Sequence, residues 1–66
     1  MRTYIRRDSH ADLTRALAEG HLIWISGTGE AFRMNKAHVN KDDAAYSAAY
    51  IMTNYPNHLF YYDEEP

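Results

Sequence analysis

The chain has 66 residues, of which 45% are hydrophobic and 24% are charged, and it contains no cysteine. This composition excludes disulfide-stabilised and thiolate-metal proteins, and the net charge of −2 excludes both a protein that coats duplex DNA and a highly acidic DNA mimic. A core of this size contributes only roughly 3–5 kcal/mol, so we expect the apolar residues to serve folding and expect no deep substrate pocket. We therefore expect residues 1–66 to form one small α+β domain.

The sequence shows neither a membrane span nor a secretion signal. Its longest unbroken apolar run, residues 22–25, is far shorter than the roughly 20 residues that cross a bilayer. No apolar stretch follows the arginines near the N-terminus, as a secretory signal would require. The default prediction is a cytoplasmic protein with no membrane partner.

The first part of the chain predicts a strand followed by a short helix. Residues 2–7 have the composition of a strand. Ser9 is the predicted N-cap of a helix over residues 10–19, with its hydroxyl accepting the Asp12 amide and the Asp12 carboxylate reaching back. Gly20 ends this helix because glycine tolerates a left-handed cap. The helix is amphipathic, and its apolar stripe is Leu13, Ala16 and Leu17.

A β-hairpin is predicted next. Residues 22–25 are β-branched and aromatic, and residues 31–35 alternate apolar with polar side chains. Residues 26–29 join them as a turn. The turn contains the pattern Gly-Thr-Gly, but a strand follows it where a phosphate-binding loop would require a helix, so we interpret it as a plain hairpin turn.

A loop, a second helix and a last strand complete the chain. Residues 36–40 are the predicted loop, and Asn40 is the predicted N-cap of a helix that ends at about Asn54, before Pro56. Its apolar side consists largely of alanine, which lets a helix lie close to a sheet. Residues 58–62 form the predicted last strand.

The resulting order, β-α-β-β-α-β, is that of the ferredoxin-like split β-α-β fold, an antiparallel sheet with two helices on one face. In this arrangement the last strand lies antiparallel beside the first. Such pairing brings the basic N-terminal segment next to the acidic C-terminal segment, namely Arg2, Arg6 and Arg7 next to Asp63, Glu64 and Glu65. The alternative is a three-stranded sheet with residues 2–7 as a frayed arm.

No residues form a recognisable catalytic or metal-binding motif. The four histidines, His10, His21, His38 and His58, lack the spacing that places two imidazoles on one helix face. Asp8 and Asp12 are better explained as complements to a helix N-terminus than as cation ligands. We therefore expect a protein that is not an enzyme and holds neither a metal nor a cofactor.

Tyrosines on the second helix provide the first candidate interaction site. Tyr46 and Tyr50 lie one turn apart on the polar side of the helical wheel, where burial would not be expected. Tyrosine is favoured at interfaces because it offers a large area, few rotamers and a polar tip. Either these rings bind a partner, or they fold over onto the domain. The candidate partner-binding residues are Tyr46, Tyr50, Asp43, Asn54 and Tyr62.

The sheet provides the second candidate site. Alternation places Leu59 and Tyr61 on one face of the last strand and Phe60 and Tyr62 on the other. A face without helices then exposes rings, which suits the stacking of single-stranded nucleic acid. The alternative is a second hydrophobic cluster or a dimer contact. The candidate nucleic-acid-binding residues are Tyr4, Arg6, Trp24 and Arg33.

Residues 29–32, Gly-Glu-Ala-Phe, resemble part of the third-strand signature of the RNA-recognition motif, whose element order is the same. Thr28 stands where that signature has a basic residue, and Glu30 stands where it has an aromatic one. Residues 10–54 resemble Hic-type toxin ribonucleases in element order. The histidine that those toxins carry at the start of the second hairpin strand is replaced here by Glu30 and Ala31.

The function that we expect is that of a non-enzymatic protein-interaction module, an inhibitor or modulator that covers a functional surface of a larger protein or protein–nucleic acid complex. Its size is typical of the accessory proteins of phages and mobile elements, such as anti-CRISPR and anti-restriction proteins. Single-stranded nucleic-acid binding is the main alternative, and self-association to a homodimer is a further one.

Overall fold

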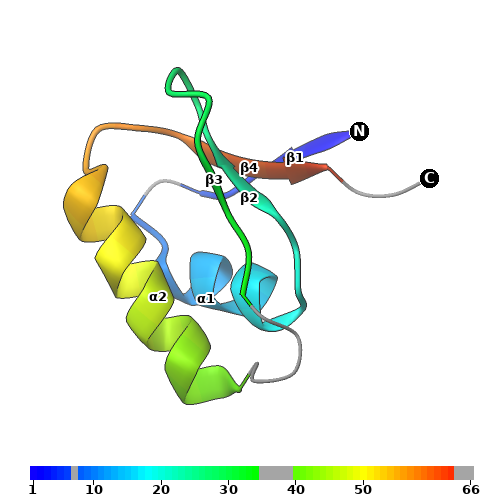
Figure 1. Cartoon of the computed structure of the whole chain (residues 1–66), viewed down its shortest axis with the longest axis vertical. Helices are drawn as coiled ribbons and strands as arrows, with labels where there is room; N and C mark the ends of the chain where they lie inside the picture. Colours follow the sequence, from blue (N-terminus) through cyan, green and yellow to red (C-terminus); the bar gives the residue numbers. More distant parts are fainter. Residues whose placement is uncertain (7, 35–39, 64–66) are drawn as a thin grey trace.

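The computed structural model describes residues 1–6, 8–34 and 40–63. Within these residues the elements follow one another in the predicted order (Figure 1). The α+β class is therefore confirmed. The elements are β1 (Arg2–Tyr4), α1 (His10–Ala18), β2 (Ile23–Ile25), β3 (Ala31–Phe32), α2 (Lys41–Asn54) and β4 (Phe60–Asp63).

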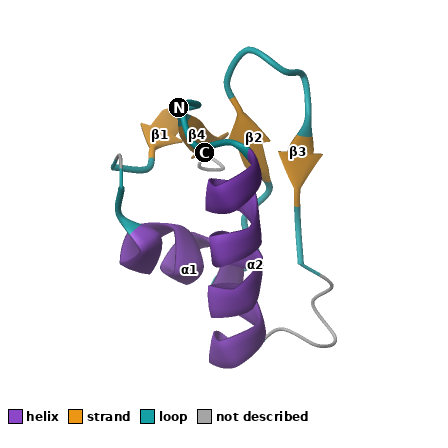
Figure 2. Cartoon of the chain, turned by 90° about the vertical axis from the view of Figure 1, so that its left-hand side faces the viewer, coloured by secondary structure: helices purple, strands orange, loops and turns teal. Residues whose placement is uncertain are grey.

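The described strands form one sheet in the order β1-β4-β2-β3, and every neighbouring pair is antiparallel (Figure 2). The predicted pairing of the last strand with the first is confirmed, with Arg2 opposite Asp63, and the alternative of a frayed arm is wrong for residues 2–4. Because β1 and β2 are both antiparallel to β4, they are parallel to each other with β4 between them. The charge pairing predicted for Arg7, Glu64 and Glu65 lies outside the described residues.

The first strand is shorter than predicted, because the chain turns sharply before α1. Residues 5 and 6 lie outside β1, although the Ile5 amide still donates to the Phe60 carbonyl at 2.8 Å. Asp8 has a φ of 63°, a left-handed conformation that no strand allows. The turn sets the direction in which α1 leaves the sheet.

Local side-chain chemistry begins α1 largely as predicted. The Ser9 hydroxyl accepts the Asp12 amide at 3.3 Å, which confirms the N-cap. The second half of the predicted capping box is wrong. The Asp12 carboxylate accepts from Arg15 at 2.7 Å instead, and the Ser9 amide donates to the Arg6 carbonyl at 3.1 Å. An arginine one turn away competes for Asp12 because its guanidinium forms a stronger, charge-assisted bond.

Gly20 ends α1 as predicted, with a φ of 86°. Its amide donates to the Leu17 carbonyl, and the His21 amide donates to the Ala16 carbonyl at 3.1 Å. This pair of bonds is the Schellman motif, which requires a left-handed residue at this position. The motif turns the chain directly into β2.

The hairpin between β2 and β3 is confirmed, and the element that follows its turn is a strand. The Ile25 amide donates to the Glu30 carbonyl at 3.0 Å and closes the turn. The Thr28 hydroxyl donates to the Ile25 carbonyl and accepts the Glu30 amide, both at 3.0 Å. Strand β3 comprises only Ala31–Phe32, so residues 33 and 34 of the predicted strand lie outside it. Asn35 is not among the described residues.

Asn40 caps α2 as predicted. Its side-chain oxygen accepts the Asp43 amide at 2.8 Å, and its side-chain nitrogen donates to the Asp43 carboxylate at 2.7 Å. The helix ends at Asn54, just before Pro56, which confirms the predicted C-terminus. Strand β4 begins two residues later than predicted, at Phe60. The loop predicted for residues 36–40 lies outside the described residues except for Asn40.

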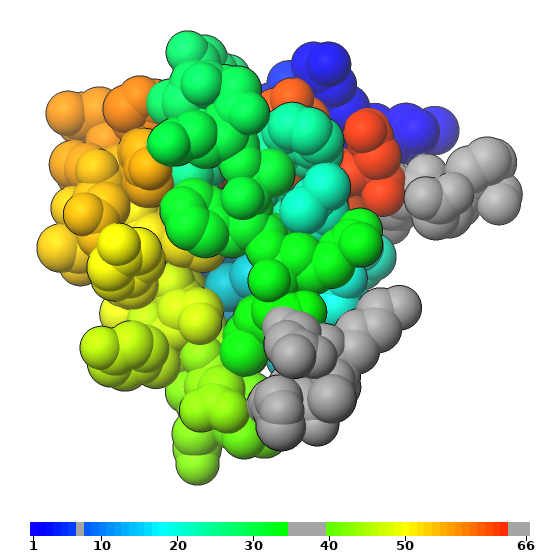
Figure 3. Space-filling view, in the orientation of Figure 1, coloured from blue at the N-terminus to red at the C-terminus, as the bar shows by residue number. Residues whose placement is uncertain are grey.

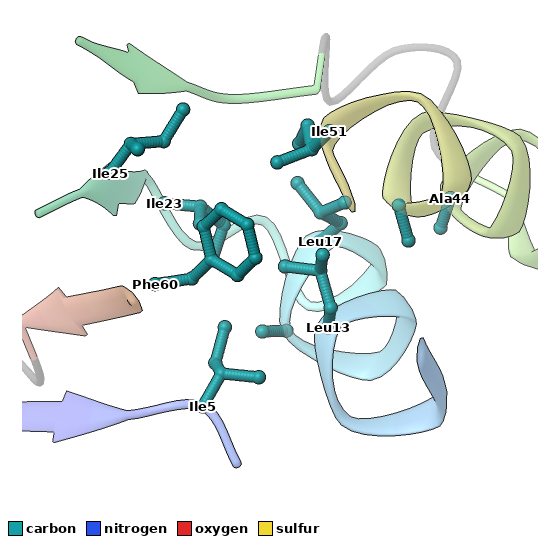
Figure 4. Packing of buried hydrophobic residues seen from close by; sticks show 10 residues of the cluster. Ile5, Leu13, Leu17, Ile23, Ile25, Ala44, Ile51 and Phe60 are labelled. Carbon is teal, nitrogen blue, oxygen red and sulfur yellow. The ribbon is translucent and has the colours of Figure 1, made fainter. Parts of the chain in front are cut away.

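Both helices pack against the same face of the sheet, as Figure 4 shows. Ala44 and Ala48 are fully buried. The prediction that small residues let this helix lie close to the sheet is wrong, because the close neighbour of α2 is α1. The described chain buries no polar or charged side chain, and neither of its two helices combines the length and the apolar composition needed to cross a membrane. The buried core consists of Ile5, Leu13, Ala16, Leu17, Ile23, Ile25, Ala44, Ala48, Ile51 and Phe60.

Candidate interaction surfaces

Only one of the aromatic residues belongs to the buried core. The chain has one Trp, six Tyr and two Phe, and Phe60 alone among them belongs to the buried core. Large rings normally dominate the interior of a small domain, because each buries 150–250 Å². Here aliphatic residues and alanines fill most of the interior, and Phe32, Tyr55 and Tyr62 are partly buried against it. The remaining rings lie outside the core.

The first group of rings lies on α2 and forms what we call the tyrosine surface: Asp43, Tyr46, Tyr50 and Asn54. Tyr46 is 78% exposed and Tyr50 is 55% exposed. The side chains of α2 stand at the left-hand outline of the molecule in Figure 3. At these exposures the Tyr46 ring lies largely in solvent, and the Tyr50 ring lies about half in solvent.

Bonds within the helix and its cap hold the polar residues of the tyrosine surface. The Asp43 carboxylate is bonded to the Asn40 cap, and the Asn54 side-chain amide donates to the Tyr50 carbonyl at 2.8 Å. The two rings therefore project from a helix that is fixed at both ends. A surface prepared in this way loses little conformational entropy on binding.

Tyr62 is separate from the other candidate partner-binding residues. It belongs to β4 and faces the helix side of the sheet, where it stacks on His21 with ring centroids 4.1 Å apart. It also lines a cavity of about 350 Å³ between β1 and α1, together with Thr3 and Glu19. The structure thus brings four of the five predicted residues together on α2 and places the fifth beside α1.

The second group of rings lies on the sheet face that no described helix covers, which we call the open face. Tyr4 pairs with Tyr61, Tyr61 pairs with Trp24, and Trp24 pairs with Ala31. The pairs form one continuous row across all four strands. The Tyr4 and Tyr61 ring centroids are 5.3 Å apart, and the planes are tilted by 46°.

Arginines flank this row, but they are not the pair that the sequence predicted. Arg2 places its guanidinium carbon 4.7 Å from the Tyr61 ring centroid. Arg33 is exposed directly after β3. Arg6 is directed instead toward α1, where its Nε lies 4.0 Å from an Asp12 carboxylate oxygen. Sequence reasoning missed Arg2 as a site residue, although the register implied by the terminal charges places it next to Tyr61.

The third group of rings joins the hairpin to the end of α2. The Tyr55 hydroxyl donates to the Glu30 carboxylate, and this bond raises the pKa of Tyr55 above its ordinary value. The Tyr55 ring also meets Phe32 and His58 edge to face, with centroids 6.1 and 5.6 Å away. These contacts tie elements of the domain together, so we assign the group a structural role.

The histidines of the described chain do not converge. The His10 Nε2 donates to the Ala45 carbonyl at 3.0 Å and links α1 to α2, while His21 stacks on Tyr62. Within residues 1–6, 8–34 and 40–63, no group of three histidine or carboxylate side chains has the geometry to hold a metal ion. The prediction for His38 lies outside these residues.

Comparisons with protein-family models, with curated proteins and with solved structures gave no match. The tyrosine surface and the open face are therefore the features from which a function can be inferred.

Proposed function

We propose that this chain is a non-enzymatic protein-binding module that docks onto a larger partner through its tyrosine surface. The supporting observation is the exposure of Tyr46 and Tyr50, which are 78% and 55% exposed and lie one helical turn apart. They are the aromatic residues of α2. Tyrosine is among the residues that contribute most to binding energy in protein interfaces. Two such rings on one helix face match the spacing by which helices insert anchors into a groove.

The size of the domain supports the proposal. A standard interface takes roughly 800 Å² from each partner, about a sixth of the 4658 Å² that the domain exposes. The helix that carries the rings is capped by Asn40 and packed through Ala44, Ala48 and Ile51. Little ordering of the backbone is then needed on binding, which favours affinity.

We extend the proposal to the mode of action. A domain of 30 × 29 × 18 Å that docks by one helix covers the partner surface beneath it. Such a domain inhibits or modulates its partner by occlusion, without chemistry of its own. This is the manner of small phage and mobile-element accessory proteins, including anti-CRISPR and anti-restriction inhibitors. The proposed partner is a larger protein or protein–nucleic acid complex.

We also propose that the fold is a variant of the split β-α-β arrangement. In that arrangement a helix joins two parallel strands that are separated by an antiparallel one. Two features support it. Helix α1 connects the parallel strands β1 and β2, which have β4 between them in the sheet. Helix α2 connects the parallel strands β3 and β4, which have β2 between them in the sheet. The first and third strands lie at the edges of this sheet.

The test is affinity capture from the native host followed by binding to the purified partner. The double variant Tyr46→Ala/Tyr50→Ala should lose at least about 30-fold in affinity, the loss expected for interface residues that dominate binding. Lys41→Gln, an exposed change on the opposite side of the same helix, is the matched control and should bind as the wild type does. Equal affinity of the double variant and the control would refute the proposal.

A further inference from the structure

The open face has a chemistry different from that of the face beneath the helices. The covered face contributes Ile23, Ile25 and Phe60 to the core. On the open face the rings of Tyr4, Tyr61 and Trp24 share the row with Ala31. One larger aliphatic side chain, that of Leu59 just before β4, is exposed on the same side. A surface that packs inside a protein core, or against a second copy of the chain, normally presents aliphatic side chains as well as rings. The open face instead offers mainly flat rings.

The rings are placed as a continuous platform. Their residues are direct cross-strand partners, so they lie at the same level of the sheet, and strands are spaced by about 4.8 Å. Tyr4, on the edge strand, is 53% exposed, while Trp24 and Tyr61 are half-buried against their neighbours. The row of three rings is thus roughly 10 Å long, which is room for two or three stacked bases.

Positive charge flanks the platform at both edges of the sheet. Arg2 lies over the Tyr61 ring at the β1 edge and also makes a side-chain hydrogen bond with Tyr4. A guanidinium group has five N–H donors, more than these contacts use. Arg33 follows β3 at the opposite edge, where its neighbours Phe32 and Met34 both pack against the core, so the exposed Arg33 lies on the side away from the helices. Asp63, opposite Arg2, is the one carboxylate that the described strands place on this face.

We propose that the open face binds single-stranded nucleic acid, with bases stacked on Tyr4, Tyr61 and Trp24 and phosphates contacted by Arg2 and Arg33. Rings supply stacking that does not depend on sequence, and guanidinium groups supply backbone contacts. A duplex hides the faces of its bases in its own stack, so it is not a ligand of this surface. This proposal goes beyond the protein-binding function and uses none of the residues of the tyrosine surface.

The number of arginines sets the expected salt dependence. Each phosphate contact to a single strand contributes about −0.7 to the slope of log affinity against log salt. Two arginines therefore predict a slope of about −1.4. Stacking is insensitive to salt, so a measurable affinity should remain when the salt is raised.

The test is titration with fluorescein-labelled oligo(dT) and oligo(rU) of about ten nucleotides at low salt, followed by anisotropy and by quenching of the single tryptophan. Tyr4→Ala should weaken binding by about 5- to 150-fold, the loss of one stacked base. Arg2→Gln should reduce the salt slope by about 0.7. The matched control is Tyr46→Ala, which removes an exposed ring from α2 and should leave binding unchanged.

Three results would overturn the proposal. The first is no binding of either oligonucleotide at low salt. The second is equal affinity for a duplex of the same length. The third is a dimer in sedimentation that Tyr4→Ala dissociates, because a second copy would then occupy the open face. Circular dichroism of each variant, compared with the wild type, ensures that lost binding is not lost folding.

Discussion

Replacing Tyr50 and Ile51 by alanine, one at a time, distinguishes surface from core within a single turn of α2. The two residues are neighbours in the sequence, yet Tyr50 is 55% exposed and Ile51 is 1% exposed. Both changes introduce the same residue into the same helix, so differences in backbone propensity are small. The difference in stability between the variants then measures what each side chain contacts.

The structure gives the expected magnitudes. Ile51 packs against the cluster that joins both helices to the sheet, and truncation of such a residue costs about 2–5 kcal/mol. The whole domain has roughly 3–5 kcal/mol, so Ile51→Ala should lose about half of its stability or more. Tyr50→Ala removes a ring that lies half in solvent and gains roughly 0.5 kcal/mol of helix propensity. The backbone carbonyl that accepts from Asn54 is retained. We expect a net loss below about 1 kcal/mol.

Urea unfolding followed by circular dichroism measures both values. In a domain of this size, about 1 kcal/mol corresponds to a shift of roughly 4–8 °C in the thermal midpoint, so thermal melts give a second reading. If Tyr50→Ala lost as much stability as Ile51→Ala, the ring would belong to the core. The tyrosine surface would then not exist as a free surface, and the reasoning that led to it would be refuted.

Two further predictions concern the turn before α1 and the hairpin contact. Asp8 adopts a φ of 63°, so Asp8→Gly should be at least as stable as the wild type, whereas Asp8→Val should lose about 1–2 kcal/mol in urea unfolding; equal stability of the two variants would show that the left-handed turn is absent. The Glu30 bond raises the pKa of Tyr55 from its ordinary value of 10.0, so its contribution to stability is complete below about pH 10 and is lost as the pH rises through the higher folded pKa. The thermal midpoint of wild type should therefore fall more steeply above about pH 10 than that of Tyr55→Phe, and parallel curves would contradict the assignment.

The sequence predicted best those features that depend on neighbouring residues. The caps at Ser9, Gly20 and Asn40 rest on bonds that span three to five residues, and each is present. The reverse bond from Asp12 failed because a charged group one turn away, Arg15, was the stronger partner. The end of β1 failed because the conformation of Asp8 is imposed by the route to α1, which periodicity does not encode.

The contrast between features set by neighbouring residues and features set by distant residues also explains the candidate sites. A helical wheel places Tyr46 and Tyr50 outside because the apolar stripe of α2 is local information. Tyr62 was grouped with them by residue type alone, and alternation along β4 sends it to the helix side. Contact between Arg2 and Tyr61 depends on the register between strands that are far apart in the sequence. Only the paired sheet brings that contact into view.

The small size of the fold explains why it has two such surfaces. One layer of two helices covers one face of one sheet, and that single contact is filled by ten residues, mainly isoleucine, leucine and alanine. The outward side of α2 and the uncovered side of the sheet are left without partners. A chain under selection for stability alone gains more by burying aromatic rings than by exposing them. Rings held on both of these sides, one set fixed by a capped helix and the other by strand register, are therefore the observation on which both binding proposals rest.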